Sequence, residues 1–151
     1  MTKEQALQKL RHYCSYQERC HSEVKTKLYQ LGVNKTLWDE MIADLIEGNY
    51  LNEERFAIAF ARGKFKMNHW GKRKIEYALK EKFISDYCIK KAMKEISEND
   101  YAEILDKLAR EKYDSMKGEQ NHVRRKKTMD YLVGRGFEGI LINKTLEEFR
   151  D

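Results

Sequence analysis

Hydrophobic residues recur at intervals of three and four along most of this chain, and that spacing is typical of amphipathic helices. In the first third, the pattern predicts three helices, over residues 3–16, from about 22 to 31, and from 34 to 47. Gly32 and Gly48 stand where glycine commonly ends a helix. Strand signals are scarce, since proline is absent and helix-forming Leu, Lys, Glu, Ala and Arg dominate the composition. We therefore expect an all-α fold.

The stretch of residues 48–61, GNYLNEERFAIAFA, predicts the start of a central helix. Asn52 is a good N-cap, and the two glutamates after it favour the positive end of the helix dipole. Leu51 and Phe56 have the spacing of a hydrophobic staple, which fixes how the chain enters the helix. Because residues 56–61 are all apolar, we expect this helix to be covered on several sides.

The apolar pattern repeats along the chain. A shift of 51 residues places the apolar positions of the second and third helices on apolar positions further on, and a further shift of 53 does so again; Leu28, for example, falls on Leu79 and then on Leu132. Chance could align any amphipathic helices, but here the turns align as well as the apolar faces. We therefore predict three three-helix repeats, over residues 1–49, 50–97 and 98–151, that share a continuous core in an elongated body whose curvature the sequence leaves open.

Positive charge is concentrated in two places. The formal net charge is +5, with six basic residues and no acidic one between positions 62 and 74, and four consecutive basic residues at 124–127. Clustered cations attract polyanions because phosphate contacts release condensed counterions. Nucleic acid, or a protein already bound to it, is therefore a candidate partner.

Three short motifs carry a resemblance to a known family. The first includes Gly48, Tyr50, Leu51, Glu54, Arg55, Phe56 and Ala57; the second Gly71, Lys72, Arg73, Ile75, Leu79 and Lys82; the third Leu132, Arg135, Gly136 and Phe137. Their order and spacing resemble those of the RecX regulatory proteins of bacteria, over essentially the whole chain. In the first motif, Asn52 replaces the aspartate that the family usually has there, and asparagine caps a helix equally well. We interpret most of the shared positions as a structural signature, namely Tyr50, Leu51, Asn52, Arg55, Phe56, Gly71, Gly136 and Phe137.

The sequence departs from the family pattern at three further positions. Phe83 stands where the family has a helix-closing glycine, which suggests that the turn in the middle repeat closes differently. Gly134 replaces one arginine of the third motif, and any role of that arginine is in doubt here. Cys20 occupies a helix-cap position that the family gives to serine.

The resemblance implies a function that composition does not reveal. Members of the family bind the RecA recombinase, chiefly as its filament on single-stranded DNA. They inhibit its ATP hydrolysis and strand exchange by lying in the filament groove or by promoting disassembly. The resemblance thus implies a monomeric, non-catalytic regulator with the RecA filament and single-stranded DNA as partners; contact with double-stranded DNA stays open.

Two candidate surfaces for nucleic acid or filament follow from the charge pattern. The first consists of Arg62, Lys64, Lys66, Trp70, Lys72, Arg73 and Lys74, where cations alternate with aromatics as in single-strand binding sites. Lys72, Arg73 and Lys74 stand at a helix start, where cations oppose the helix dipole, and this hints at an anionic partner. The second consists of Arg124, Arg125, Lys126, Lys127 and Arg135, of which two or three can face one partner. For each, an ordinary solvated helix face is the alternative.

The first repeat offers a weaker set of cations. Arg19, Lys25 and Lys27 lie close to Glu18 and Glu23, and we expect those carboxylates to neutralise them.

Other chemistry is less well supported by the sequence. The only close group of metal-ligand types is His12, Cys14, Cys20 and His21, whose spacing suits no common zinc site. No nucleotide-binding glycine loop, nucleophile motif or cluster of acids is evident, so we expect no cofactor and no enzyme activity. No apolar stretch has the length of a membrane span, and we expect a cytosolic protein with free thiols.

Two alternatives to the recombinase regulator stay open. One is a general basic helical protein that binds DNA or RNA without a recombinase partner, and the other is a small hydrolase whose site the sequence does not reveal. ATP hydrolysis by the recombinase, measured with and without this protein, distinguishes the first from the regulator.

Overall fold

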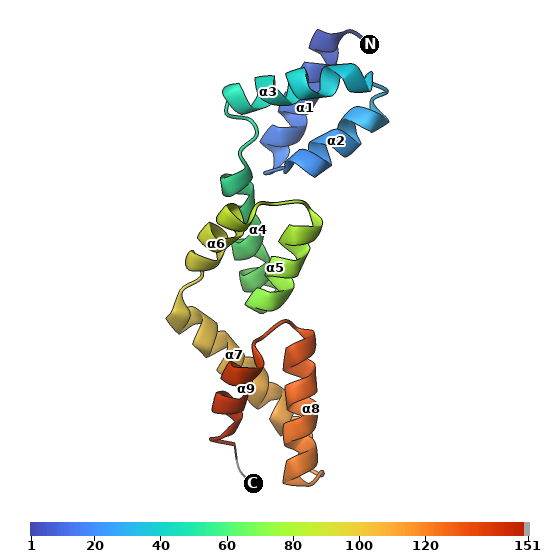
Figure 1. The fold of residues 1–151 in the computed structure, drawn as a ribbon. Coiled ribbons are helices and arrows are strands. Elements are labelled where there is room, and N and C mark those ends of the chain that lie inside the picture. The colour runs from blue at the N-terminus through green and yellow to red at the C-terminus, as the bar shows by residue number, and fades with distance from the viewer. Residues whose placement is uncertain (150–151) are drawn as a thin grey trace. The chain divides into compact units, whose positions relative to one another are not determined.

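The computed structural model describes residues 1–149, and within that range it contains α-helices, one short 3₁₀ turn and no strand (Figure 1). The elements are α1 (Lys3–Tyr16), α2 (His21–Gln30), η1 (Lys35–Leu37), α3 (Trp38–Glu47), α4 (Glu53–Asn68), α5 (Lys72–Glu81), α6 (Asp86–Lys94), α7 (Glu98–Asp114), α8 (Asn121–Gly134) and α9 (Gly139–Leu146). The predicted all-α class is confirmed. The bounds that we predict for the individual repeats remain a prediction.

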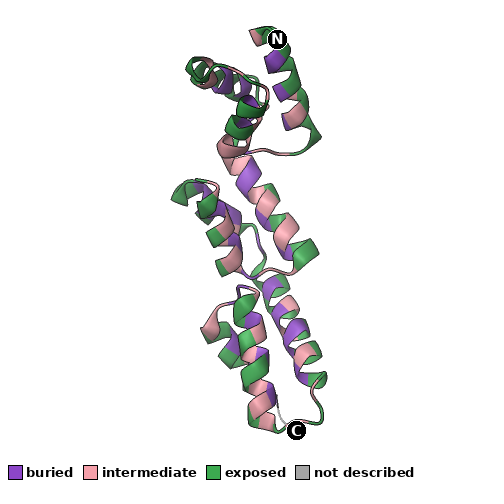
Figure 2. Cartoon of the chain, turned by 90° about the vertical axis from the view of Figure 1, so that its right-hand side faces the viewer, coloured by how far each residue is buried: buried purple, intermediate pink, exposed green. Residues whose placement is uncertain are grey.

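The chain forms two compact units that do not coincide with consecutive stretches of sequence. One consists of residues Met1–Phe60 and Leu79–Ala92, and the other of Ala61–Ala78 and Met93–Asp151. Helices α4 and α5 therefore each contribute residues to both units. Buried positions recur along each helix between exposed ones, as the period of an amphipathic helix requires (Figure 2).

The core of the first unit is built where α1, α2 and α3 meet. Leu10, Leu28, Met41 and Leu45 are fully enclosed there, and Leu51, two residues before α4, belongs to the same cluster. Thr2 and Gln5 form the expected capping box at the start of α1. The third predicted helix is divided in two, because Asn34 caps the 3₁₀ turn η1 and the α-helix proper begins at Trp38.

The start of α4 is held by local bonds and by two contacts from elsewhere in the first unit. The Asn52 side chain accepts the backbone N–H of Arg55 at 2.8 Å, as expected of an N-cap. The Arg55 guanidinium donates to Glu18 at 2.6 Å and to the carbonyl of Asn49 at 3.0 Å. The Glu53 carboxylate accepts the backbone N–H of Ser85 at 2.8 Å, so it joins the starts of α4 and α6 in addition to facing the helix dipole.

The apolar run of α4 is less covered than we expected. Phe56, Ala57 and Ala61 are buried, whereas Ile58 and Phe60 are half-buried and Ala59 is exposed. Cover on several sides is therefore found at five of the six positions, and Ala59 is the exception, with little apolar area to bury. Sequence hydrophobicity alone does not distinguish such a position from a core one.

Three helices, one in each predicted repeat, end in matching turns, and α3 ends with the same hydrogen-bond pattern at Asn49, which has a φ of 63°. Gly32, Phe83 and Gly136 have positive φ values of 73°, 63° and 99°. In each case this residue donates its N–H three residues back and the next residue donates five residues back, to Leu28, Leu79 and Leu132, at 3.1 Å each. This is the Schellman pattern of helix termination. The three turns stand at the predicted shifts of 51 and 53 residues.

The structure corrects the expectation for Phe83. We expected the middle turn to close differently without glycine, but its hydrogen bonds match those of the two glycine turns and its φ is positive like theirs. A side chain with a Cβ is strained in this conformation, and the Phe83 side chain is 84% exposed, so packing does not compensate for the strain.

Replacing Phe83 with glycine should therefore stabilise the protein. We expect Phe83→Gly to raise the free energy of unfolding by about 1 kcal/mol, since it relieves left-handed strain and removes no buried contact. Urea denaturation measures this change. Gly32→Ala is the matched control and should lower stability, because its Cβ meets no atom within 4 Å but the backbone has the same positive φ. Loss of stability in Phe83→Gly would contradict this account.

Candidate nucleic-acid interface

The loop between α4 and α5 lies in the second unit and carries Trp70, the aromatic residue of the first candidate surface. His69, with a φ of 54°, ends α4: its N–H donates to Phe65 at 3.0 Å, and the N–H of Trp70 donates to Lys64 at 3.1 Å. The loop is therefore fixed by backbone hydrogen bonds from the helix that precedes it, and Trp70 has a defined position.

Trp70 lies between two lysines of the predicted surface. The ammonium groups of Lys64 and Lys74 are 4.8 Å and 4.7 Å from the ring centroid, which is cation–π distance. The ring itself is half-buried. An aromatic ring with a cation on each flanking helix is the combination that single-strand binding sites use to hold a base and its phosphates.

The backbone at the start of α5 is already hydrogen-bonded, which changes how this helix start can bind an anion. The N–H groups of Gly71 and Arg73 donate to the carbonyls of Arg135 and Gly136 at 2.8 Å and 3.0 Å. The N–H of Lys72 donates to the Tyr101 hydroxyl at 2.9 Å. A phosphate at this helix start would therefore be held mainly by side chains, because the N–H groups of residues 71–73 are already bonded.

The two signature glycines of the second unit meet each other. A Cβ on Gly71 would lie 2.3 Å from the carbonyl carbon of Gly136, and a Cβ on Gly136 would lie 2.4 Å from the Lys74 side chain. No other residue type leaves room for the turn after α8 to lie against the start of α5. Both glycines were predicted to be structural, but no local pattern in the sequence pairs them across 65 residues.

Arg135 belongs to the Trp70 loop and does not join the basic run of α8. Its guanidinium donates to the carbonyl of His69 at 3.3 Å and also to the carbonyl of Asn68. These are the carbonyls at the end of α4, which have no partner within their own helix. Arg135 thus positions the loop that carries Trp70, while its side chain is only partly available to a ligand.

The basic run on α8 is divided among different contacts. Arg124 is buried, stacks 3.7 Å from the centroid of the Tyr113 ring and donates to the Tyr113 carbonyl at 3.0 Å. Arg125 donates to the carbonyls of Phe149 and Leu146. Lys126 and Lys127 are exposed and pair with Asp130 at 3.0 Å and Glu119 at 2.7 Å. The four residues do not form one surface.

The remaining predicted cations vary in availability. Arg62 pairs with Glu95 at 3.1 Å, and Lys72 lies 4.9 Å from the Tyr101 ring. Lys66 and Arg73 are exposed, and within residues 1–149 neither side chain has a hydrogen bond or ion pair. The set that the structure brings together is therefore Lys64, Trp70 and Lys74. Lys66 and Arg73 are exposed on α4 and α5 and do not contact the Trp70 ring.

Tyr101 was not among the predicted site residues, but it packs beneath the start of α5 and accepts the backbone N–H of Lys72. Its ring lies between Phe65 and Phe137, with centroid distances of 5.7 Å and 5.3 Å, and its hydroxyl donates to the Glu138 carboxylate. Burial, and next the hydrogen bond to Glu138, raise the pKa of Tyr101 above its ordinary value. Only the amphipathic position of Tyr101 was readable in the sequence, and that predicts a core residue.

The signature residues of the first motif lie elsewhere, in the first unit. Leu51 and Phe56 are buried, Tyr50 is half-buried against the core of α1–α3, and Asn52 and Arg55 make the α4 contacts described above. None of these side chains is in the Trp70 cluster.

Metal and thiol chemistry find little support in the described part of the chain. Among residues 1–149, no three His, Cys, Asp or Glu side chains are grouped so that they could hold a metal ion. Cys14, Cys20 and Cys88 are free and buried. Burial raises the pKa of the Cys14 thiol to about 11. Over the same residues, no helix has both the length and the apolar character that crossing a membrane requires.

The fold and the site together define a class: a helical repeat protein of three-helix units with a basic, aromatic surface. Family models described as the second and third three-helix domains of RecX match residues 52–93 and 98–146. The Regulatory protein RecX of Prosthecochloris aestuarii is 31% identical over 136 residues, which cover 90% of this chain and 87% of that protein. The chain belongs to the RecX family.

Further comparisons agree on the fold. The crystal structure of RecX from Lactobacillus salivarius matches 96% of this chain and 94% of its own with a TM-score of 0.87 and 23% identity. The Regulatory protein RecX of Lactobacillus johnsonii is 33% identical over 98 residues, and that match spans only 36% of its length. The match to the Bacillus cytotoxicus relative spans 52% of that protein. Some relatives thus contain long regions outside the match.

Substituting Gly71 should be costly because its neighbour is backbone. We expect Gly71→Ala to lower the free energy of unfolding by about 1–3 kcal/mol, the range for an overpacked contact. Gly63→Ala is the matched control: Gly63 is inside α4 with no atom within 4 Å of an added Cβ, and alanine there should stabilise by about 0.5–1 kcal/mol. Chemical denaturation of both variants checks the prediction. Equal effects of the two substitutions would show that the Gly71–Gly136 contact has no energetic weight.

The Tyr101 phenol should make stability depend on alkaline pH. Because its folded pKa is raised above the ordinary value of 10.0, the native state keeps the proton while the unfolded state loses it. Stability from this group is complete below about pH 10 and is lost as the pH rises above that value. We expect Tyr101→Phe to flatten this decline and, near pH 7, to cost about 1–3 kcal/mol because the Lys72 N–H loses its acceptor.

Urea denaturation between neutral and alkaline pH measures both effects. Tyr29→Phe is the control, since Tyr29 is 77% exposed. The same decline above pH 10 in Tyr101→Phe as in the unmodified protein would disprove the role of this phenol.

Proposed function

We propose that this protein regulates the RecA recombinase. It binds the RecA filament on single-stranded DNA and inhibits ATP hydrolysis and strand exchange, either by occupying the filament groove or by promoting disassembly. It acts by binding and occlusion as a monomer, without catalysis of its own and without a cofactor. Its site of action is then the cytoplasm, where the filament forms.

Membership of the RecX family is the main support for the recombinase partner. The observation on this chain that supports the proposal best is the Trp70 cluster, in which Lys64 and Lys74 flank an aromatic ring on a loop fixed by Arg135. A filament groove contains both protein and DNA, and a ring with adjacent cations is suited to a surface where bases and phosphates are accessible.

The cations differ in the role they take in this proposal. Lys66 and Arg73 are exposed and can reach phosphate without breaking a contact of their own. Lys64 and Lys74 lie on Trp70, where they also keep the ring in place. Lys126 and Lys127 would have to leave Asp130 and Glu119 first, so we give them a secondary role. Arg124 is buried and Arg125 bonds backbone carbonyls, so the proposed surface does not include them.

A general nucleic-acid binder without a recombinase partner is the alternative, and the same basic surface is compatible with it. The two functions differ in one measurable respect. Only a filament regulator changes ATP hydrolysis by the recombinase when it is present in far smaller amounts than the recombinase itself.

ATP hydrolysis by RecA on single-stranded DNA should fall when this protein is added at a substoichiometric amount. The double variant Lys66→Glu/Arg73→Glu reverses two charges on the proposed surface. We therefore expect it to reach the same inhibition only at a concentration about fivefold or more above that of the unmodified protein. Lys90→Glu/Lys91→Glu, exposed on α6, is the control with the same charge change and should inhibit as the unmodified protein does. No inhibition by the unmodified protein, together with salt-dependent DNA binding, would favour the alternative.

A further inference from the structure

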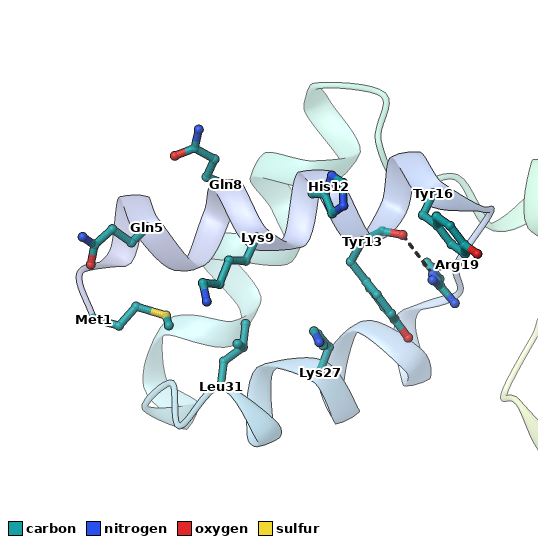
Figure 3. Close-up of a pocket in the computed structure, with 10 residues that line it drawn as sticks. All are labelled: Met1, Gln5, Gln8, Lys9, His12, Tyr13, Tyr16, Arg19, Lys27 and Leu31. Atoms are coloured by element: carbon teal, nitrogen blue, oxygen red, sulfur yellow. Dashed lines mark hydrogen bonds between the residues drawn. The ribbon is translucent and has the colours of Figure 1, made fainter.

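A groove in the first unit lies between α1 and α2, well apart in sequence from the Trp70 cluster. It is open to solvent, with a volume of about 990 Å³, and Figure 3 shows the side chains of both helices that face it. Its chemistry is carried by six of its lining residues: Lys9, His12, Tyr13, Tyr16, Arg19 and Lys27.

The groove is positively charged, contrary to our expectation that nearby glutamates would neutralise its cations. Glu18 pairs with Arg55 at 2.6 Å. Glu23 pairs with Lys82 at 3.3 Å and accepts the backbone N–H of Cys20 at 3.2 Å. Both carboxylates are thus engaged elsewhere in the unit, and among residues 1–149 no acidic side chain lines the groove.

The cations of the groove have few partners of their own. Among residues 1–149, neither Lys9 nor Lys27 has an ion pair or a hydrogen bond from its ammonium group. Arg19 has no ion pair there and makes one hydrogen bond, from Nε to the carbonyl of Tyr13 at 3.0 Å. Its two terminal nitrogens therefore retain their donors for a ligand.

The aromatic side chains of the groove lie within cation–π distance of Arg19 and Lys27. The Arg19 guanidinium stacks 3.7 Å from the centroid of the Tyr13 ring and lies 6.0 Å from that of Tyr16, while the Lys27 ammonium is 5.4 Å from Tyr13. Tyr16 is 79% exposed at the end of α1, beside Arg19 (Figure 3). A stacked guanidinium is held in one orientation, and the exposed ring next to it has a free face.

We propose that the α1–α2 groove binds a segment of single-stranded nucleic acid, with a base stacked on Tyr16 and with Arg19, Lys9 and Lys27 on the adjacent phosphates. The open shape admits a strand that passes through it, and the absence of carboxylates matches a polyanion. An acidic protein segment would satisfy the cations but has no use for the exposed aromatic face. The inference requires no recombinase, and it adds a contact in the first repeat to the surface proposed on the second unit.

Fluorescence anisotropy of a labelled oligothymidylate of about 16 nucleotides, with the full chain and no recombinase, tests the groove. We expect Tyr16→Ala to weaken binding about fivefold or more and Tyr16→Phe to stay within about twofold, since the ring face carries the contact. Tyr29→Ala is the matched control, because Tyr29 is 77% exposed on α2 and does not line the groove. Its affinity should be unchanged.

The salt dependence tests the phosphate contacts separately. Lys9→Ala/Lys27→Ala should reduce the slope of log affinity against log salt by about 1.4, because each single-strand phosphate that a lysine neutralises contributes about 0.7 to that slope. Lys25→Ala/Lys90→Ala removes the same charge from exposed positions outside the groove and should leave the slope nearly unchanged. Thermal unfolding confirms that each variant is folded.

Two outcomes would overturn the proposal. Equal reductions in affinity in the groove variants and their controls would show that binding depends on net charge alone. An oligoglutamate peptide that displaces the strand, combined with unchanged strand affinity in Tyr16→Ala, would assign the groove to an acidic protein segment. Failure of the recombinase assay with the strand results intact would refute the proposed function and leave this inference standing.

Discussion

The second unit depends on the contact between Gly71 and Gly136, where two backbones approach too closely for any side chain. That approach lets the carbonyls of the turn after α8 accept the N–H groups at the start of α5, and it brings the Tyr101 hydroxyl to the Lys72 N–H. The start of α5 therefore needs no capping residue of its own, although three cations stand in its first turn. The Trp70 loop is positioned as a consequence, between this contact and the end of α4.

Features decided by neighbours in sequence could be predicted. The Asn52 cap, the capping box at Thr2 and the period of the apolar faces all depend on bonds within a few residues, so the sequence contains the necessary information. The repeat of the turns was predictable for the same reason. Phe83 was the exception, because we took glycine to be required where the hydrogen bonds of the turn hold even a strained phenylalanine in place.

The candidate site was predictable in composition but not in arrangement. The run from Arg62 to Lys74 identified the residues that meet around Trp70, yet nothing local indicated that Arg135 joins them across 66 residues. Nor did the sequence show that Glu18 and Glu23 pair with Arg55 and Lys82, since those partners are 37 and 59 residues away. Which partner a charge takes is decided by long-range packing, and a charge count along the chain does not contain that information.

Several arginines in the basic runs bond backbone carbonyls, so a run of basic residues contains more cations than are available to a ligand. Arg124, Arg125 and Arg135 each donate to backbone carbonyls at helix ends or turns, where carbonyls lack partners within a helix. A guanidinium has five donors in a rigid plane and suits this task, whereas the single ammonium of a lysine does not bridge two carbonyls as readily. Lysines such as Lys66 consequently stay at the surface, and arginines contribute to a ligand site where their donors are left over, as at the stacked Arg19 and the exposed Arg73. The number of phosphates that this chain can contact is therefore set by its exposed lysines and a few arginines, well below its total of thirty basic residues.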